Sequence, residues 1–274
     1  MPWTRGTLRA SFPIMSITRG EFLKSLRKSI PGMVLNGAVV TAAQKVLGKM
    51  AAVSGATDLP APSPSGTAGN ETTASDAKIE FIKSGPTNGN RIALTFDDGP
   101  TPGVTDRILD ELKQRKLHAT FFMIGQRIAA EPDLARRVLA EGHEIANHTF
   151  THPNLNTLPE PQIEAEIQKT QDIMGEILHH RAAWFRPPFG ALRQNQAGLL
   201  AKRGLGIVLW NVDPSDWSQP GTDKIIGTIL TETQPGSIIV CHDLHGQTAE
   251  SVGPICDGLL ERGFAPVTLS GLLG

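Results

Sequence analysis

The sequence contains no tyrosine and only two cysteines, Cys241 and Cys256. Two cysteines cannot build a disulfide framework, and neither has a partner at metal-binding spacing, so we expect both to be small buried hydrophobic residues. Because tyrosine is absent, any stacking on a substrate must come from the four tryptophans and ten phenylalanines of the 274-residue chain.

The sequence also lacks an excess of either charge, with 26 Lys and Arg against 27 Asp and Glu. A formal net charge of −1 gives no electrostatic drive toward nucleic acid or anionic lipid. The composition, 39% hydrophobic and 19% charged, is that of a soluble globular protein. We expect a monomer without a nucleic-acid partner.

The N-terminal residues lack an apolar run that could span a bilayer, which requires about 20 residues. The run Ile30–Ala43 is shorter and is interrupted by Pro31 and Asn36, which suits the hydrophobic region of an export signal. Upstream, Thr18–Lys24 resembles a twin-arginine signal in which Gly20 replaces the second arginine.

These features predict that residues 1–56 form a signal or anchor segment, starting at Met1 or Met15. The protein would then be exported to the periplasm, the cell envelope or the medium, and attached to a membrane only if this segment is not cleaved. An uncleaved helix or an overextended start is the alternative. Residues 57–78 are rich in Pro, Ser, Gly and Thr and predict a disordered linker.

From Ile79 to the end, residues 79–274 alternate between apolar runs of strand length and helical patterns, which predicts a single catalytic domain. The seven predicted strands are 91–98, 119–124, 143–148, 182–185, 205–212, 237–242 and 264–269. Continuous apolar strands that are each followed by a helix indicate a parallel sheet covered on its faces. Seven such units, without a phosphate loop or dinucleotide fingerprint, favour a distorted (β/α)7 barrel of the α/β class, similar to a TIM barrel.

Two adjacent carboxylates, Asp97 and Asp98, stand at the end of the first of these strands. Such a pair is costly to bury unless a positive charge lies beside it, and a divalent metal would meet that need. Asp-Asp-Gly-Pro is also good turn chemistry, so a plain turn is the alternative at this point.

Ionisable groups recur at the carboxyl ends of five of the seven predicted strands, while the strand interiors carry almost none. Besides the two aspartates, these groups are His148 and His152, Arg186, Asp213 and Asp216, and His242 and Asp243. In a (β/α) barrel this rim is the working face. His148 and His152 are four residues apart, so on a helical turn they would share one face and could hold one ion.

The segments TFDDGP, HTFTH, RPPFG, DPSDW and VCH, in this order, resemble the five motifs of the polysaccharide deacetylases, the NodB-homology domains of carbohydrate esterase family 4. That family removes N- or O-acetyl groups from chitin, peptidoglycan, xylan and related polymers. The resemblance covers residues 79–274. It implies a hydrolase that acts on the acetyl groups of a polysaccharide or oligosaccharide, with the N-acetyl groups of N-acetylglucosamine as the first expectation.

The resemblance also implies a role for each motif residue. Asp97 would be the general base, paired with Arg186. Asp98, His148 and His152 would bind one divalent metal, with zinc expected first and cobalt, nickel or manganese as alternatives.

On the other side of the reaction, His242 would be the general acid and Asp216 would orient it. The chemistry supports the pair, because an amine leaving group needs a proton and histidine titrates near neutral pH. Val240 stands where the family usually has leucine, a change expected to alter only the wall of the acetyl pocket. The residues expected to contact the substrate are Trp217, Val240, Pro187 and Phe189.

Several alternatives stay open from the sequence. Two histidines and a carboxylate also form the facial triad of non-haem iron oxygenases, although that activity leaves the remaining motif residues unused. An O-acetyl esterase of the xylan type and an inactive carbohydrate-binding relative are the others. Asp213 is expected only to shape its loop, and Asp243 and His245 are candidates to line the site. His143, His179 and His180 are expected to be solvated.

Overall fold

The computed structural model of the chain describes residues 79–274. The predicted signal or anchor segment, 1–56, and the predicted linker, 57–78, lie outside the described residues. None of the helices in the described part is long and apolar enough to cross a membrane.

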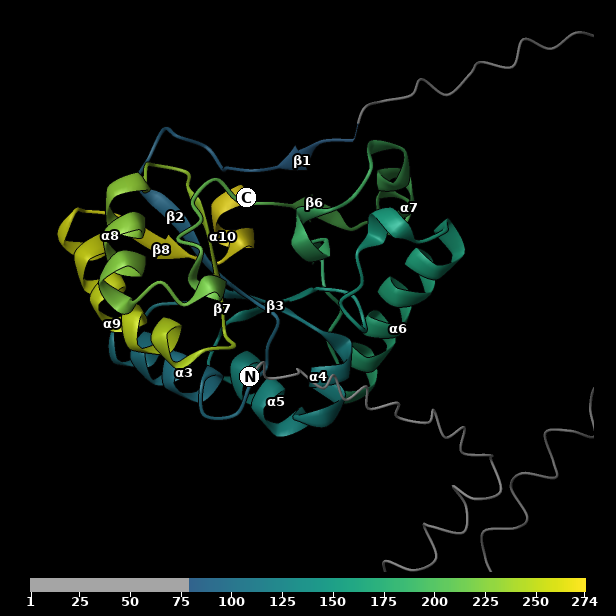
Figure 1. The fold of residues 1–274 in the computed structure, drawn as a ribbon, viewed down its shortest axis with the longest axis horizontal. Helices are drawn as coiled ribbons and strands as arrows, with labels where there is room; N and C mark the ends of the chain where they lie inside the picture. The colour runs from purple at the N-terminus through teal and green to yellow at the C-terminus, as the bar shows by residue number, and fades with distance from the viewer. Residues whose placement is uncertain (1–78) are drawn as a thin grey trace, which may run out of the picture. The chain divides into compact units, whose positions relative to one another are not determined.

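Residues 79–274 form one curled parallel sheet with helices around it, which confirms the distorted (β/α)7 barrel (Figure 1). The strand order is β1-β6-β5-β4-β3-β2-β7, and β8 pairs with the first part of β2. The strands are β1 (Phe81–Ile82), β2 (Arg91–Asp97), β3 (Thr120–Met123), β4 (Glu144–Asn147), β5 (Trp184–Phe185), β6 (Gly206–Val208), β7 (Ile238–His242) and β8 (Ala265–Val267).

The helices lie on the outside of this sheet, with α8, α9 and α3 on one side and α6 and α7 on the other (Figure 1). The helices are α3 (Thr105–Gln114), α4 (Gly125–Ala130), α5 (Pro132–Ala140), α6 (Glu160–Leu178), α7 (Ala197–Ala201), α8 (Thr222–Glu232), α9 (Gly246–Glu261) and α10 (Leu269–Leu273). The sequence prediction missed β1 and the short helices α4 and α10. It also made most strands too long, at their first residues as well as at their last ones.

The missed strand β1 helps to close the barrel between β6 and β7. Phe81 and Ile82 pair in parallel with β6, and Ser84 then forms an antiparallel bridge with Ser237 just before β7. Beyond β6, Val212 bridges directly to Ile239 of β7. The sheet therefore meets itself, although its individual strands are short.

Two apolar layers follow from the alternation of side chains along the strands. One face of the sheet packs against the helices, for example through Phe96 of β2, Phe121 of β3 and Cys241 of β7. The opposite face contributes a second cluster inside the barrel: Ala93, Phe122, Ala146, Val208 and Ile238, together with Leu269 and Leu272 of α10. Both cysteines are buried and unpaired, as predicted.

Helix α10 covers the amino-terminal ends of the strands, opposite the rim that carries the ionisable groups. The Leu269 N–H donates to Thr120 Oγ1 at 2.9 Å at the start of β3, and Ser270 contacts Glu144 at the start of β4. At the start of β2, Arg91 donates to the Gly271 carbonyl at 2.6 Å. Helix α10 thus covers the amino-terminal ends of β2, β3 and β4, and the ionisable groups lie at the opposite ends of the strands.

His143 is buried just before β4, so the expectation that it is solvated was wrong. Its Nδ1 accepts the Ala119 N–H at 3.2 Å, and its ring packs edge-on against Phe121 and His118. Burial, followed by the charge of His118, lowers the pKa of His143 from 6.5 to about 4. His179 is exposed, whereas His180 is only partly so and contacts the Ile145 carbonyl through Nε2 at 3.2 Å.

This buried histidine predicts a loss of stability on mild acidification. Between pH 6.5 and about 4 the unfolded chain binds a proton at His143 that the folded chain rejects, so stability falls as the pH falls through this window. Thermal unfolding of His143→Gln should therefore depend less on pH across this window than that of the wild type. His179→Asn, which removes an exposed histidine, is the matched control, and equal pH dependence in the wild type and His143→Gln would contradict the prediction.

Candidate active site

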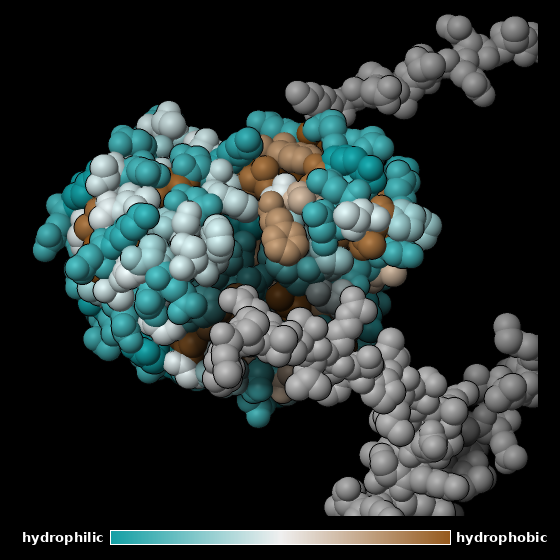
Figure 2. Space-filling model, in the orientation of Figure 1, coloured by the Kyte–Doolittle hydropathy of each residue, from teal (hydrophilic) through white to brown (hydrophobic). Residues whose placement is uncertain are grey.

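The carboxyl ends of the strands surround a cavity of about 450 Å³. The residues that line it are Asp97, Asp98, His148, His152, Phe189, Trp210, Asp213, Trp217 and His242. On the face in view in Figure 2, hydrophobic side chains gather around a hollow near the centre, while most of the surrounding surface is hydrophilic. The chemical groups predicted at separate strand ends therefore meet in one place.

Asp98, His148 and His152 direct three ligand atoms at one point. Asp98 Oδ1 lies 3.3 Å from His148 Nε2 and 3.1 Å from His152 Nε2. His148 Nδ1 is 2.7 Å from the Arg186 carbonyl, which can only accept, so the ring donates there through Nδ1 and its Nε2 is the nitrogen directed at Asp98. Asp98 Oδ1 is buried and has no hydrogen-bond partner. These groups fit a cation, and they are the only such trio among residues 79–274.

From the sequence, we expected His148 and His152 to converge on a helical turn. In the structure they lie on a loop instead. Thr149 and His152 both adopt the left-handed conformation, with φ of 65° and 60°. Asp98 also leaves its strand at a φ of 79°. Burial alone would raise the pKa of the Asp98 carboxyl, but the imidazoles of His148 and His152 outweigh burial and hold this pKa well below its usual range.

Arg186 and Asp97 form a fully buried ion pair at the side of the cavity. Arg186 Nη1 donates to Asp97 Oδ1 at 2.7 Å and to Thr95 Oγ1 at 2.8 Å. The remaining guanidinium nitrogens donate to the Val208 and Leu209 carbonyls at 3.3 and 3.0 Å. Removal of either charge would leave the other buried without a partner, so the pair holds both side chains in place.

His242 and Asp216 form the second pair. The His242 Nδ1–H donates to Asp216 Oδ1 at 2.7 Å, which leaves Nε2 free for the cavity. Asp216 is fully buried, and its Oδ2 accepts the His242 N–H at 2.8 Å and the Thr248 hydroxyl at 2.6 Å. Burial by itself would lower the pKa of His242, but the bond to Asp216 and the charges of Asp97, Asp216 and Asp98 raise it to about 9. A cation bound at Asp98 would offset part of this negative charge and return the pKa toward neutrality.

Aromatic side chains form the rim of the cavity. Phe189 and Trp217 are 68% and 58% exposed, which is unusual for side chains of this size and leaves their faces free for a ligand. Trp210 also lines the cavity but was missed from the sequence. Trp210 follows Val208 by two residues, and the Val208 side chain faces the barrel interior. The two-residue alternation of a strand could therefore have predicted that Trp210 faces the interior as well.

The other predicted residues do not reach the cavity. Val240 and Pro187 are buried and are not among its lining residues. Asp243, fully buried, contacts Gly99 and accepts the Thr105 hydroxyl at 2.5 Å, and His245 also lies outside the lining. Asp213 does line the cavity, and its Oδ1 accepts the Ser215 N–H at 2.7 Å, so it shapes its loop as expected.

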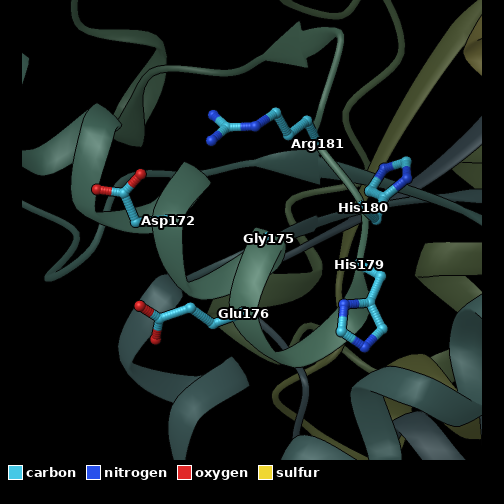
Figure 3. Close-up of a pocket in the computed structure, with 6 residues that line it drawn as sticks. All are labelled: Asp172, Gly175, Glu176, His179, His180 and Arg181. Carbon is cyan, nitrogen blue, oxygen red and sulfur yellow. The ribbon is translucent and has the colours of Figure 1, made fainter. Parts of the chain in front are cut away.

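A larger cavity of about 590 Å³ lies at the end of α6, away from these groups. Figure 3 shows that its two histidines, His179 and His180, point away from each other, and that Asp172 and Glu176 extend separately from the helix. These side chains do not converge on a point, so the smaller cavity is the candidate active site.

Comparison with known proteins agrees with this assignment. A family profile for polysaccharide deacetylase matches residues 84–208. A chitooligosaccharide deacetylase of Bradyrhizobium is 42% identical over 66% of this chain and 90% of its own length. The structure of the peptidoglycan N-acetylglucosamine deacetylase Bc1960 superposes with a TM-score of 0.70 at 36% identity, covering 72% of this chain and 94% of the other.

Not every similar structure is of an active enzyme. A pseudoenzyme of family CE4 from Bacillus anthracis has a TM-score of 0.69 at 28% identity and covers 73% of this chain and 70% of its own. The chitooligosaccharide deacetylase of Bradyrhizobium, 42% identical and matched over 90% of its length, nevertheless establishes the family. The chain belongs to the polysaccharide deacetylases of carbohydrate esterase family 4.

Proposed function

We propose that residues 79–274 remove N-acetyl groups from N-acetylglucosamine units of a carbohydrate polymer, such as peptidoglycan or a chitooligosaccharide, with a bound zinc ion. The observation that carries this proposal is the convergence of Asp98 Oδ1 and His148 Nε2, 3.3 Å apart in a buried position. Without a cation or a proton between them such groups repel. His152 supplies the third ligand.

The ligand set favours a catalytic zinc ion over a structural one. Two imidazoles and one carboxylate are ligands that zinc accepts, and three protein ligands leave coordination positions open for water and substrate. Cobalt, nickel or manganese could occupy the same set. A divalent cation held there would lower the pKa of adjacent water to about 7 and draw charge from the acetyl carbonyl.

Asp97 is suited to take the proton from the attacking water. It lines the cavity next to Asp98, and the hydrogen bond from Arg186 to its Oδ1 holds the carboxylate in place. Three further hydrogen bonds, to Thr95 Oγ1 and the Val208 and Leu209 carbonyls, anchor the guanidinium that holds this carboxylate.

His242 is suited to complete the reaction. As the water oxygen bonds to the acetyl carbon and the carbon–nitrogen bond breaks, the leaving nitrogen needs a proton, which the free Nε2 of an imidazolium can donate. Asp216 holds the ring through Nδ1 and stabilises its charge. The products are acetate and a free amine on the sugar. Phe189 and Trp217 would stack on sugar rings beside the reacting unit.

The site of action follows from the predicted signal or anchor segment and from the relatives named above. We propose that the enzyme acts outside the cytoplasm, and that a membrane contact, if present, is made through residues 1–56 alone. No feature of the described residues favours a nucleic-acid partner.

The test is acetate release from N-acetylated chitooligosaccharides, peptidoglycan and acetylated xylan, with and without added zinc. We expect zinc-dependent release from an N-acetylated substrate, removed by a chelator and restored by zinc. Release from xylan alone would support the O-acetyl esterase. Absence of release from all three, with tight binding of a polymer, would support an inactive binding protein and contradict the proposal. Restoration by iron alone, with oxygen consumption, would support an oxygenase.

A further inference from the structure

We infer that Glu166, on helix α6, is a positioning residue for the metal site, because its carboxylate holds the loop that carries the two histidine ligands. The inference rests on the proposed metal site and adds a residue that lies outside the motifs. Glu166 does not line the cavity, so its effect would be exerted through the loop.

Three hydrogen bonds join Glu166 to the loop between His148 and His152. Oε2 accepts the backbone N–H groups of Phe150 and Thr151 at 2.9 and 2.7 Å. Oε1 accepts the Thr151 hydroxyl at 2.9 Å. One carboxylate therefore satisfies two consecutive N–H groups in the middle of the loop, and hydrogen bonds to an ionised acceptor are stronger than neutral ones.

The other backbone N–H groups of the loop have partners outside Glu166. His148 donates to the Met123 carbonyl, Thr149 to Asn147 Oδ1, and His152 to Thr149 Oγ1, at 3.1, 2.9 and 3.1 Å respectively. On the opposite side of the loop, the Thr149 and Phe150 carbonyls accept N–H groups of Gly125 and Gln126 in α4 at 2.9 and 3.1 Å. Hydrogen bonds therefore join the loop to both α4 and α6.

These hydrogen bonds hold a segment of strained backbone. Thr149 and His152 are held in the left-handed conformation, which is unfavourable for a residue other than glycine and persists only where surrounding contacts enforce it. Both residues flank the N–H groups that Glu166 accepts. Without Glu166 the loop could relax, and His152, which ends the strained segment and is partly exposed, would lose its direction toward Asp98.

Helix α6 is a rigid base for Glu166. Its neighbours Ile163, Ile167 and Thr170 are buried, and the Thr170 hydroxyl donates to the Glu166 carbonyl at 3.0 Å. Lys169, one turn along, lies over the Phe150 ring at 3.6 Å from its centre. The position of the carboxylate is therefore set by a packed helix and not by the loop it supports.

The experiment compares zinc affinity in the full chain, measured by competition with a fluorescent chelator, for the wild type, Glu166→Ala, Glu166→Gln and Glu164→Gln. Glu166→Ala should bind zinc about 10–100-fold more weakly, the usual effect of removing a group that supports metal ligands. Glu166→Gln should stay within about threefold of the wild type, because its oxygen can accept both N–H groups and its amide can donate to the Thr151 hydroxyl. The control is Glu164→Gln, which changes another glutamate of α6 and breaks the ion pair of Glu164 with Arg203. It should match the wild type.

Melting temperatures of the zinc-free proteins separate positioning from stability. A lower melting temperature of Glu166→Ala with unchanged zinc affinity would overturn the inference, and so would an equal loss of affinity in Glu166→Gln, which would assign the effect to charge alone. If Glu166→Ala does not fold, Glu166→Met, with a side chain of similar length, carries the same expectation. Failure of the wild type itself to bind zinc would instead overturn the proposed metal site.

Discussion

An Asp98→Ala variant is expected to lose both its bound metal and its deacetylase activity, whereas Asp97→Asn is expected to keep the metal and lose only turnover. The two residues are adjacent but differ in their contacts. Asp98 Oδ1 faces two imidazole nitrogens, while Asp97 Oδ1 faces the guanidinium of Arg186. Removal of a general base typically reduces the rate by about 10²–10⁴-fold.

The measurement is metal content by elemental analysis after zinc loading and dialysis, together with acetate release from the substrate identified for the wild type. Since Asp97→Asn leaves Arg186 buried without its counter-charge, a melting curve is needed to confirm that the variant is folded. Loss of metal in folded Asp97→Asn with retention in Asp98→Ala would require that the two roles be exchanged.

His242→Ala is expected to reduce N-deacetylation by about 10²–10⁴-fold, the usual contribution of a general acid. The hydrolysis of an aryl acetate should fall much less in the same variant. An amine cannot leave without a proton, whereas an activated phenolate leaves without one. The comparison therefore isolates the proton donation from every other contribution of the residue.

Asp216→Asn is the companion variant. It should act in the same direction with a smaller effect, because it alters the orientation and charge of the imidazole while the proton donor remains. It should also lower the pKa that limits activity on the alkaline side, since the carboxylate contributes to the raised pKa of His242. Equal losses on the amide and the activated ester in His242→Ala, with metal and fold intact, would exclude His242 as the general acid.

The sequence predicted the barrel and most of the cavity because both depend on local patterns. Continuous apolar strands followed by helices define the sheet, and the carboxyl ends of parallel strands meet at one rim, so Asp97, Asp98 and His242 could be brought together without knowledge of any contact. The spacing of His148 and His152 gave the right convergence for an incorrect reason. In the structure their side chains converge because Thr149 and His152 adopt the left-handed conformation, which the sequence pattern does not predict.

The features that were missed depend on contacts between distant segments. Strand β1 is only two residues long, so it has no pattern of its own and exists because β6 offers an edge. From the sequence, His143 is a residue at a strand edge and was expected to be solvated. In the structure, the rings of Phe121 and His118 pack against it. Val240 was expected at the pocket wall from its place in a family motif. It lies two residues before His242 and so faces the same side of β7, but this alternation gives only the direction of a side chain and not its depth in the barrel.

The pairing of β2 with β7 and β8 determines when the active site can first exist. Asp97 lies on the first long strand of the domain, yet that strand pairs on one side with β7, which carries His242, and along its first residues with β8, near the end of the chain. Contacts of such long sequence separation form late and slowly. A growing chain that has emerged only as far as α8 holds Asp97, Asp98 and both metal-binding histidines but has neither His242 nor a closed barrel. We therefore expect activity to begin only after β7 and β8 have been made and have paired with β2.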